Sequence, residues 1–218
     1  MEPDHWHLRW QQGRTGFHTG EPNPWLERFY PELGLNSGDT VLLPLCGKAV
    51  DLVWLAQHKH NVLGVELSEI ALQHFFEEQQ LAAVRSQQPP FTQWESGPIT
   101  LLEGDFFDLA PQQTVDCRAV FDRAALVALP AEMRQRYVAH LATLLSSGTT
   151  ILLVTTDYPQ QEKTPPPFAV SDTEVQQLYR DAFEVEQLHS EDLSHSQDPL
   201  SKRGVTALVE NIYRITRQ

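Results

Sequence analysis

Thr40–Lys48 (TVLLPLCGK) and Val62–Leu67 (VLGVEL) are the two stretches that decide the fold. Each contains an apolar run of strand length, and the first ends in a tight turn at Gly47 from which a helix is expected to start. Strand, turn, helix and second strand form one βαβ unit. Such a unit binds a nucleotide-type ligand over its first turn, and an acid near the end of the second strand takes the ribose hydroxyls. The sequence therefore predicts that Glu66 is the ligand carboxylate.

The turn contains a single glycine. Dinucleotide sites use three, because the backbone must approach a pyrophosphate closely. Here Leu45 and Cys46 stand where a pyrophosphate would need room. S-adenosylmethionine has ribose and adenine but no pyrophosphate, so it fits this turn better, with its aminoacyl tail along the turn and its ribose diol at Glu66. One glycine and one acid leave other doubly wound proteins open, because one fold hosts many functions.

Helical and strand patterns alternate along the rest of the chain. Helices are expected at 48–58, after Ser68, at 131–146 and from a capping box at Ser171–Glu174 to Ala182. Further strands are expected at 99–105, 117–122, 150–156, 183–188 and 205–215. The last two should form an antiparallel hairpin. The predicted fold is an α/β Rossmann-like sandwich: a mostly parallel seven-stranded sheet with an antiparallel C-terminal hairpin strand and helices on both faces.

Residues 85–98 are expected to form a loop, because Pro89-Pro90 and Gly97-Pro98 cannot continue a helix. The helix before this loop is expected to turn Phe75 and, further on, Val84 toward the sheet.

The chain is acidic, with a formal net charge of -13 over 218 residues. Its length suits one domain, 1–218, made of an N-terminal segment at 1–38 and a core at 39–218. An acidic surface disfavours nucleic acids and anionic membranes as partners. No apolar run approaches the roughly 20 residues that span a bilayer. The first residues lack the hydrophobic stretch of a secretory signal, so a cytoplasmic protein is expected.

The two cysteines fit that location. Cys46 and Cys117 are expected at opposite ends of a parallel sheet, too far apart for a disulfide, and reduced thiols suit the cytosol. Cys46 lies beside the turn and could be a nucleophile, but a small apolar side chain packed beside the ligand is the favoured interpretation. The His-x-His pairs at 5–7 and 58–60 lack further ligands nearby, so no metal is expected. Phosphate-binding and hydrolase motifs are absent from the sequence.

Aromatic residues mark the N-terminal segment. Trp6 and Trp10 share one helical face, and Phe17 follows a glycine-containing break. This segment could pack on the surface of the fold, as aromatic stripes usually do. It could also cover the ligand, because stacking and water exclusion suit an adenine and a sulfonium cation.

Two further candidates follow predicted strands. Asp105 could accept a hydrogen bond from the exocyclic amine of an adenine, or it could cap a turn. Arg123 ends a strand at the edge where open α/β sheets bind their ligands, so it is a candidate for holding a substrate anion. Its alternative role is a salt bridge to Asp122 or to another acid at that edge.

With these residues in view, the chain resembles the thiopurine S-methyltransferase family, specifically its bacterial members, over nearly its whole length. The motifs that carry the resemblance are Trp6-x3-Trp10, Thr15–His18 (TGFH), Pro44–Asp51 (PLCGKAVD), Gly64–Ser68 (GVELS), Phe107–Leu109 (FDL), Asp122–Ala128 (DRAALVA) and Pro166–Phe168 (PPF).

The resemblance implies a class I S-adenosylmethionine-dependent methyltransferase with an N-terminal helical lid, and S-adenosylhomocysteine as the product. The implied cofactor residues are Trp6, Trp10, Phe17, Leu45, Gly47, Glu66, Asp105, Phe106 and Arg123. In the family the tryptophans and the phenylalanine cover the cofactor, and the arginine lies beside both the methyl donor and the thiopurine. Arg123 is therefore the expected catalytic residue, and Asp105 departs from the small hydroxyl residue of other members.

The implied acceptor-side residues are Arg123, Phe17, Lys202 and Arg203. Mammalian relatives carry a second arginine where this chain has Pro199, and Lys202 and Arg203 are the nearest cations.

The resemblance thus implies methyl transfer to thiopurines and related aromatic or heterocyclic thiols by direct in-line displacement. A cation such as Arg123 favours the thiolate, so no dedicated general base is needed. Selenium or tellurium compounds are further possible acceptors, which would imply a role in their detoxification, and a monomer is the simpler expectation. Two alternatives stay open: a non-catalytic S-adenosylmethionine-binding sensor, and a nicotinamide-dependent oxidoreductase on a similar fold.

Overall fold

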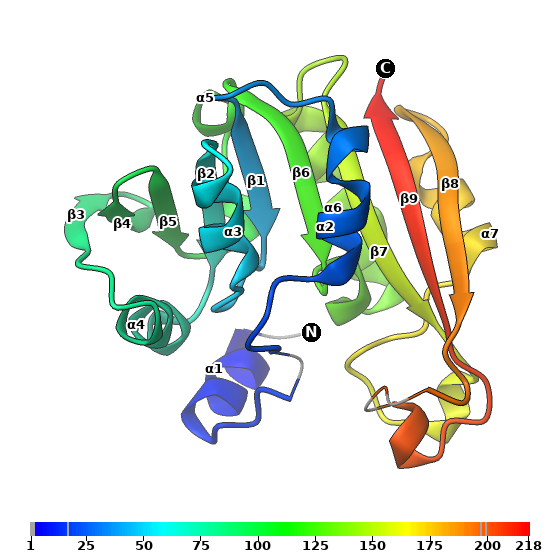
Figure 1. Ribbon diagram of the computed structural model, residues 1–218. Helices are drawn as coiled ribbons and strands as arrows, with labels where there is room; N and C mark the ends of the chain where they lie inside the picture. Colours follow the sequence, from blue (N-terminus) through cyan, green and yellow to red (C-terminus); the bar gives the residue numbers. More distant parts are fainter. Residues whose placement is uncertain (1–2, 17, 197, 199) are drawn as a thin grey trace.

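A computed structural model of the chain describes residues 3–16, 18–196, 198 and 200–218 (Figure 1). Phe17 and Pro199, both singled out from the sequence, lie outside the described residues. No helix of the described part is long and apolar enough to cross a membrane.

One nine-stranded sheet runs through the molecule, in the order β3-β4-β5-β2-β1-β6-β7-β9-β8. The five parallel strands at its centre are β1 (Thr40–Pro44), β2 (Asn61–Glu66), β5 (Ile99–Glu103), β6 (Cys117–Arg123) and β7 (Thr150–Asp157). The C-terminal strands are β8 (Phe183–Asp192) and β9 (Val209–Arg217). Because β9 runs antiparallel to both β7 and β8, the predicted fold class and its C-terminal hairpin are confirmed.

The expected loop at 85–98 is wrong. The segment forms strands β3 (Val84–Gln88) and β4 (Phe91–Ser96), so the sheet has nine strands rather than seven. The proline and glycine pairs that suggested a loop are instead the two-residue turns that join β3 to β4 and β4 to β5. β3 has almost no buried face and therefore no apolar alternation that a sequence pattern could reveal. Val84 is exposed on it, not part of the preceding helix.

Helices cover both faces of the sheet. The first face carries α2 (Pro24–Phe29), α3 (Asp51–Gln57) and α4 (Glu69–Glu78), and the second carries α6 (Ala131–Leu144) and α7 (Asp172–Tyr179). Shorter pieces are α1 (Pro3–Gln11), α5 (Pro111–Thr114), η1 (Tyr30–Leu33), η2 (Phe106–Asp108), η3 (Leu126–Ala128), η4 (Gln160–Glu162) and η5 (Ser201–Arg203). Figure 1 shows α1, and the segment between β8 and β9, at the end of the sheet where β1 and β7 end.

Local signals explain where the helices begin. Asn23 caps α2 by accepting a hydrogen bond from the Trp25 amide (2.9 Å), and Ser171 caps α7 through the Glu174 amide (3.3 Å). α3 starts at Asp51, three residues after the expected start, because the chain is still turning through Gly47 and Lys48.

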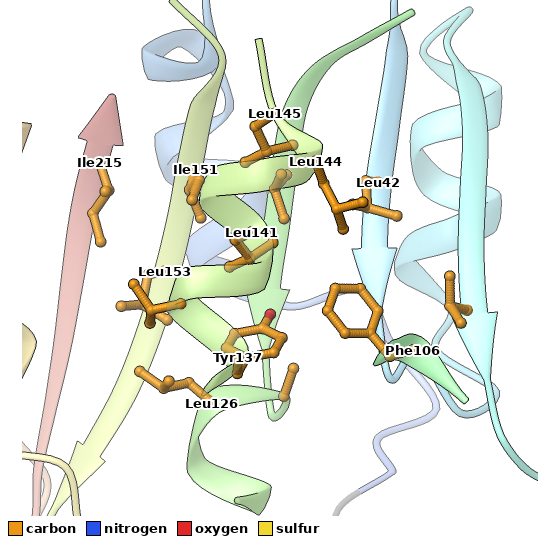
Figure 2. Packing of buried hydrophobic residues seen from close by; sticks show 14 of the residues in the cluster. Leu42, Phe106, Leu126, Tyr137, Leu141, Leu144, Leu145, Ile151, Leu153 and Ile215 are labelled. Carbon is orange, nitrogen blue, oxygen red and sulfur yellow. The ribbon is translucent and has the colours of Figure 1, made fainter. Parts of the chain in front are cut away.

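Each face of the sheet has its own apolar core, because successive residues of a strand point to opposite sides. On β1, Leu42 packs against the α6 face while Val41 and Leu43 pack against the α2 and α3 face. Figure 2 shows Tyr137 and Leu141 of α6 pointing into the core on the α6 and α7 face, the second core.

The same alternation divides Asp122 from Arg123 at the end of β6. Asp122 is fully buried on the α6 face, where it accepts hydrogen bonds from the Tyr137 hydroxyl (2.7 Å) and the Leu126 amide (3.1 Å). Arg123 then points to the α2 and α3 face. Burial raises the pKa of Asp122 to about 6, against the opposing effect of the hydrogen bonds that it accepts.

Asp122→Asn should change the pH dependence of stability. The Asp122 carboxyl binds its proton more tightly in the folded protein than at its ordinary pKa of 3.8. Its stabilising contribution is therefore complete below about pH 4 and is lost as the pH rises through about 6, a change on the order of 3 kcal/mol. The asparagine variant lacks this decline. Urea unfolding from pH 4 to 7 measures it, and parallel curves for the two proteins would contradict the assignment.

Candidate functional site

The turn after β1 has a constrained backbone. Leu45 (φ +47°) and Gly47 (φ +55°) both lie in the left-handed region, which a leucine rarely adopts. The Cys46 amide between them donates a hydrogen bond to the Val65 carbonyl (3.0 Å), which holds the turn against β2. A non-glycine residue kept in this conformation next to a predicted ligand position is typical of functional sites.

Glu66, at the end of β2, ties this turn to the next connection. Its Oε2 accepts a hydrogen bond from the Gly47 amide (2.9 Å) and its Oε1 accepts one from the Ser68 amide (2.8 Å). The residue is only 6% exposed, and burial raises the pKa of the carboxyl while the accepted bonds lower it. Each oxygen uses one N–H here and can accept a second donor.

Trp10 of α1 lies over Gly47. A Cβ atom added at Gly47 would come within 3.1 Å of Trp10 Cζ2, so the indole packs on the glycine itself. Trp10 is buried, whereas Trp6 is half-buried with the Arg9 guanidinium 5.9 Å from its ring centre. The structure therefore brings Trp10, Gly47 and Glu66 together, as expected from the sequence.

The connection after β5 joins the same region. The Gly104 amide donates to the Glu66 carbonyl (3.0 Å), which sets the end of β5 beside the end of β2. Asp105 is exposed and caps η2 by accepting from the Phe107 amide (2.9 Å). The Phe106 ring is buried in the second core, 5.2 Å from the Tyr137 ring (Figure 2). Its side chain is thus directed into the protein, which leaves its backbone for any ligand contact.

Arg123 is half-buried among charged groups from three other segments. Burial raises the pKa of Asp51, the first residue of α3, and of Glu210 on β9, and the positive charge of Arg123 opposes both shifts. Burial lowers the pKa of His18, and Arg123 adds to that effect. The structure therefore places the arginine between the N-terminal segment, the α3 end of the first turn and the C-terminal hairpin.

A chain of hydrogen bonds runs beside Arg123. Asp51 Oδ1 accepts a hydrogen bond from the backbone N–H of Asn23 (2.7 Å), and the Asn23 side chain accepts one from the backbone N–H of Trp25. The Trp25 indole N–H in turn donates to Glu210 Oε2 (2.7 Å). Sequence analysis missed Trp25 and Glu210. They are 185 positions apart, and only the position of β9 beside β7 brings them together.

The remaining sequence candidates lie in the segment that joins β8 to β9. Lys202 and Arg203 belong to η5, and the Lys202 side chain is exposed. Thr206 anchors this segment to η4, because its hydroxyl (2.7 Å) and amide (2.8 Å) both donate to the Glu162 carboxylate. The segment and Arg123 belong to the same end of the sheet (Figure 1).

Neither cysteine is placed for nucleophilic chemistry. Cys46 and Cys117 are both buried and free of disulfides, and burial raises the pKa of each thiol. Cys46 instead packs in the apolar core between the sheet and α2, α3 and α4, which agrees with the favoured interpretation of its sequence position. Within the described part of the chain, no three His, Cys, Asp or Glu side chains are arranged to hold a metal ion.

Gly47→Ala and Gly34→Ala should separate backbone strain from the Trp10 contact. Both glycines have a left-handed φ, and alanine at either position should destabilise the protein by about 1–2 kcal/mol. A Cβ at Gly34 meets nothing within 4 Å, whereas one at Gly47 presses on Trp10. Urea unfolding should therefore show the larger loss for Gly47→Ala. Equal losses would show that the α1 indole does not pack on the turn.

Comparison with known proteins agrees with this geometry. The family model described as thiopurine S-methyltransferase (TPMT) matches residues 1–218. A thiopurine S-methyltransferase of Pseudomonas fluorescens is 45% identical over 218 residues, which are 100% of this chain and 98% of that protein. One from Azotobacter vinelandii is 44% identical, with 100% of both chains covered.

The solved structures show the fold. An S-adenosylmethionine-dependent methyltransferase from Anabaena variabilis superimposes with a TM-score of 0.69 at 17% identity, covering 99% of this chain and 95% of the other. Because its sequence is so different, this likeness speaks for architecture alone. The match along 1–218 and the identity to the bacterial enzymes decide the relationship: the chain belongs to the thiopurine S-methyltransferase family of S-adenosylmethionine-dependent methyltransferases.

Proposed function

We propose that this chain methylates the sulfur of thiopurines and related aromatic or heterocyclic thiols. The observation that carries the proposal is the position of Arg123 at the same sheet edge as the Glu66–Gly47 turn, within a chain of this family. S-adenosylmethionine supplies a methyl group on a positively charged sulfur, which the acceptor sulfur takes by direct in-line displacement. The protein's contribution is to bind, align and exclude water.

The residues of the turn suit S-adenosylmethionine. An aminoacyl tail would run along the turn beside the Leu45 backbone, next to the Trp10 indole that packs on Gly47. Glu66 keeps an acceptor position on each oxygen, which suits the two ribose hydroxyls. Asp105 is exposed beside η2, where its carboxylate suits the amine of an adenine, and Phe106 would contribute through its backbone.

The N-terminal segment is proposed as the lid. Trp10 already covers Gly47, and Trp6 lies on the same short helix. The His18 imidazole lies 3.9 Å from the carboxylate of Glu78 on α4, and Lys48 of the turn pairs with the same carboxylate, so Glu78 links this segment to the turn. On the family resemblance, Phe17 is proposed as a further contact of the cofactor and the acceptor.

On the acceptor side, Arg123 favours the thiolate, because an opposite charge nearby lowers the pKa of a thiol. The acceptor sulfur then needs no general base. Lys202 and Arg203 are proposed as further contacts from the segment between β8 and β9. Reduced selenium and tellurium compounds are nucleophiles of the same kind and form the next class of acceptors to test. Their methylation would give the protein a role in detoxification.

Family membership supports methyl transfer over a nicotinamide-dependent oxidation. A sensor would bind S-adenosylmethionine and transfer nothing, so turnover distinguishes it. We further propose that the protein is cytoplasmic, in keeping with two buried cysteines that form no disulfide, and monomeric, which is the simpler expectation.

Arg123→Ala should impair turnover far more than cofactor binding. We expect kcat for 6-mercaptopurine with labelled S-adenosylmethionine to fall about 10- to 100-fold, because a charge-assisted contact to the thiolate is lost. Affinity for S-adenosylhomocysteine, measured by calorimetry, should change little. Arg118→Ala is the matched control, since Arg118 is an exposed arginine at the other end of β6. Equal losses of turnover and affinity would assign Arg123 to the cofactor or the fold.

Glu66→Ala should weaken cofactor binding about tenfold or more, because charged hydrogen bonds to the ribose are lost. It should also lower stability, since the buried Gly47 and Ser68 amides lose their acceptor at about 1–3 kcal/mol each. Calorimetry and urea unfolding measure the two effects. Glu77→Ala, an exposed acid on α4, is the control for charge. Unchanged affinity for S-adenosylhomocysteine would remove the ribose assignment.

A further inference from the structure

Glu210 on β9 lies on the same sheet face as Arg123 on β6, with β7 between them. Arg123 is beside Val154 of β7, and Val154 is beside Ile212 of β9. Glu210 is two residues from Ile212 and beside Thr156, so its side chain shares the face of Ile212 and Arg123. The backbones of β6 and β9 lie about 10 Å apart with β7 between them, and Val154 is buried on the face that the two side chains share.

The Glu210 carboxylate is held in place by a residue of α2. The Trp25 indole donates to its Oε2 (2.7 Å), and α2 packs over this part of the sheet (Figure 1). Among the described residues no hydrogen bond is made to Oε1. The charged groups around Glu210 are Arg123 on β6, Glu191 opposite it on β8, and Asp198 in the β8–β9 connection. A partly buried acid, one of whose oxygens accepts a hydrogen bond, thus lies between two proposed acceptor contacts. These are Arg123, the proposed partner of the thiolate, and the segment that joins β8 to β9.

A heterocyclic thiol offers two different groups to such a pair. Its sulfur carries the negative charge, and the imidazole ring of a thiopurine keeps an N–H donor after the sulfur is ionised. A carboxylate oxygen accepts such a donor and a guanidinium cannot, because it has donors alone. The arginine and the acid, on opposite sides of β7, therefore match the two ends of one planar molecule.

We propose that Glu210 determines acceptor specificity: its carboxylate accepts a hydrogen bond from a ring N–H of a heterocyclic thiol whose sulfur lies beside Arg123. The inference rests on the proposed function and names the acceptor class that this site prefers. Thiols without a ring N–H still meet Arg123 but gain nothing from Glu210.

Glu210→Gln tests this with little change of shape. The glutamine carbonyl still accepts from the Trp25 indole, and the remaining group becomes an NH2 that cannot accept. We expect kcat/KM for 6-mercaptopurine to fall about tenfold or more, as for other hydrogen bonds to a charged group. The value for 9-methyl-6-mercaptopurine, which has no N–H once its sulfur is ionised, should not change. Equal losses on both substrates, or none, would overturn the proposal.

Two further measurements complete the test. Glu184→Gln removes the same charge from the far end of the β8–β9 ladder and should leave both acceptors unaffected. Calorimetric binding of 6-mercaptopurine to the protein saturated with S-adenosylhomocysteine should weaken about tenfold in Glu210→Gln. Binding that depends on Glu210 without any turnover by the native protein would contradict the proposed function alone. Turnover and binding that ignore Glu210 would contradict this inference alone.

Discussion

The site depends on the carboxylate of Glu66. Two backbone amides from different connections, those of Gly47 and Ser68, donate to its two oxygens, and its own carbonyl accepts from Gly104. One residue thus fixes the ends of β1, β2 and β5 relative to one another. Burying a carboxylate is unfavourable unless its oxygens are hydrogen-bonded, and the accepted amides supply that compensation. A group held in this way needs little reorganisation when a ligand arrives.

The turn that Glu66 holds is itself strained, which explains why the clamp is needed. Leu45 and Gly47 both adopt a left-handed backbone, and a leucine stays there only if its surroundings prevent relaxation. The Cys46 amide bond to Val65 and the Trp10 indole on Gly47 provide two such restraints. The helix α1, which we propose as part of a lid, thus also packs against the turn and helps to keep its backbone conformation.

How far the sequence could predict this structure differs between its parts. The βαβ unit, the position of Glu66 and the strand that ends at Arg123 follow from apolar runs and one glycine, and these are confirmed as elements. The β3–β4 hairpin was missed because β3 is an exposed edge strand with no alternation. The direction of the Phe106 ring could not be predicted either. It depends on Tyr137, a helix residue that only the folded core brings near.

The proposed cofactor half of the site and the half around Arg123 differ in how far local sequence positions them, and this difference bears on function. The proposed cofactor residues from Leu45 to Glu66 lie within one local unit, so local rules position them and a sequence pattern can find them. The groups around Arg123 come instead from α2, α3 and β9, and are assembled by the sheet order. Substitutions in any of these elements can reshape the proposed acceptor side while Glu66 and its amides stay unchanged. Acceptor preference is therefore the property most free to vary among proteins that share this cofactor turn, and residues such as Glu210 are where that variation should be sought.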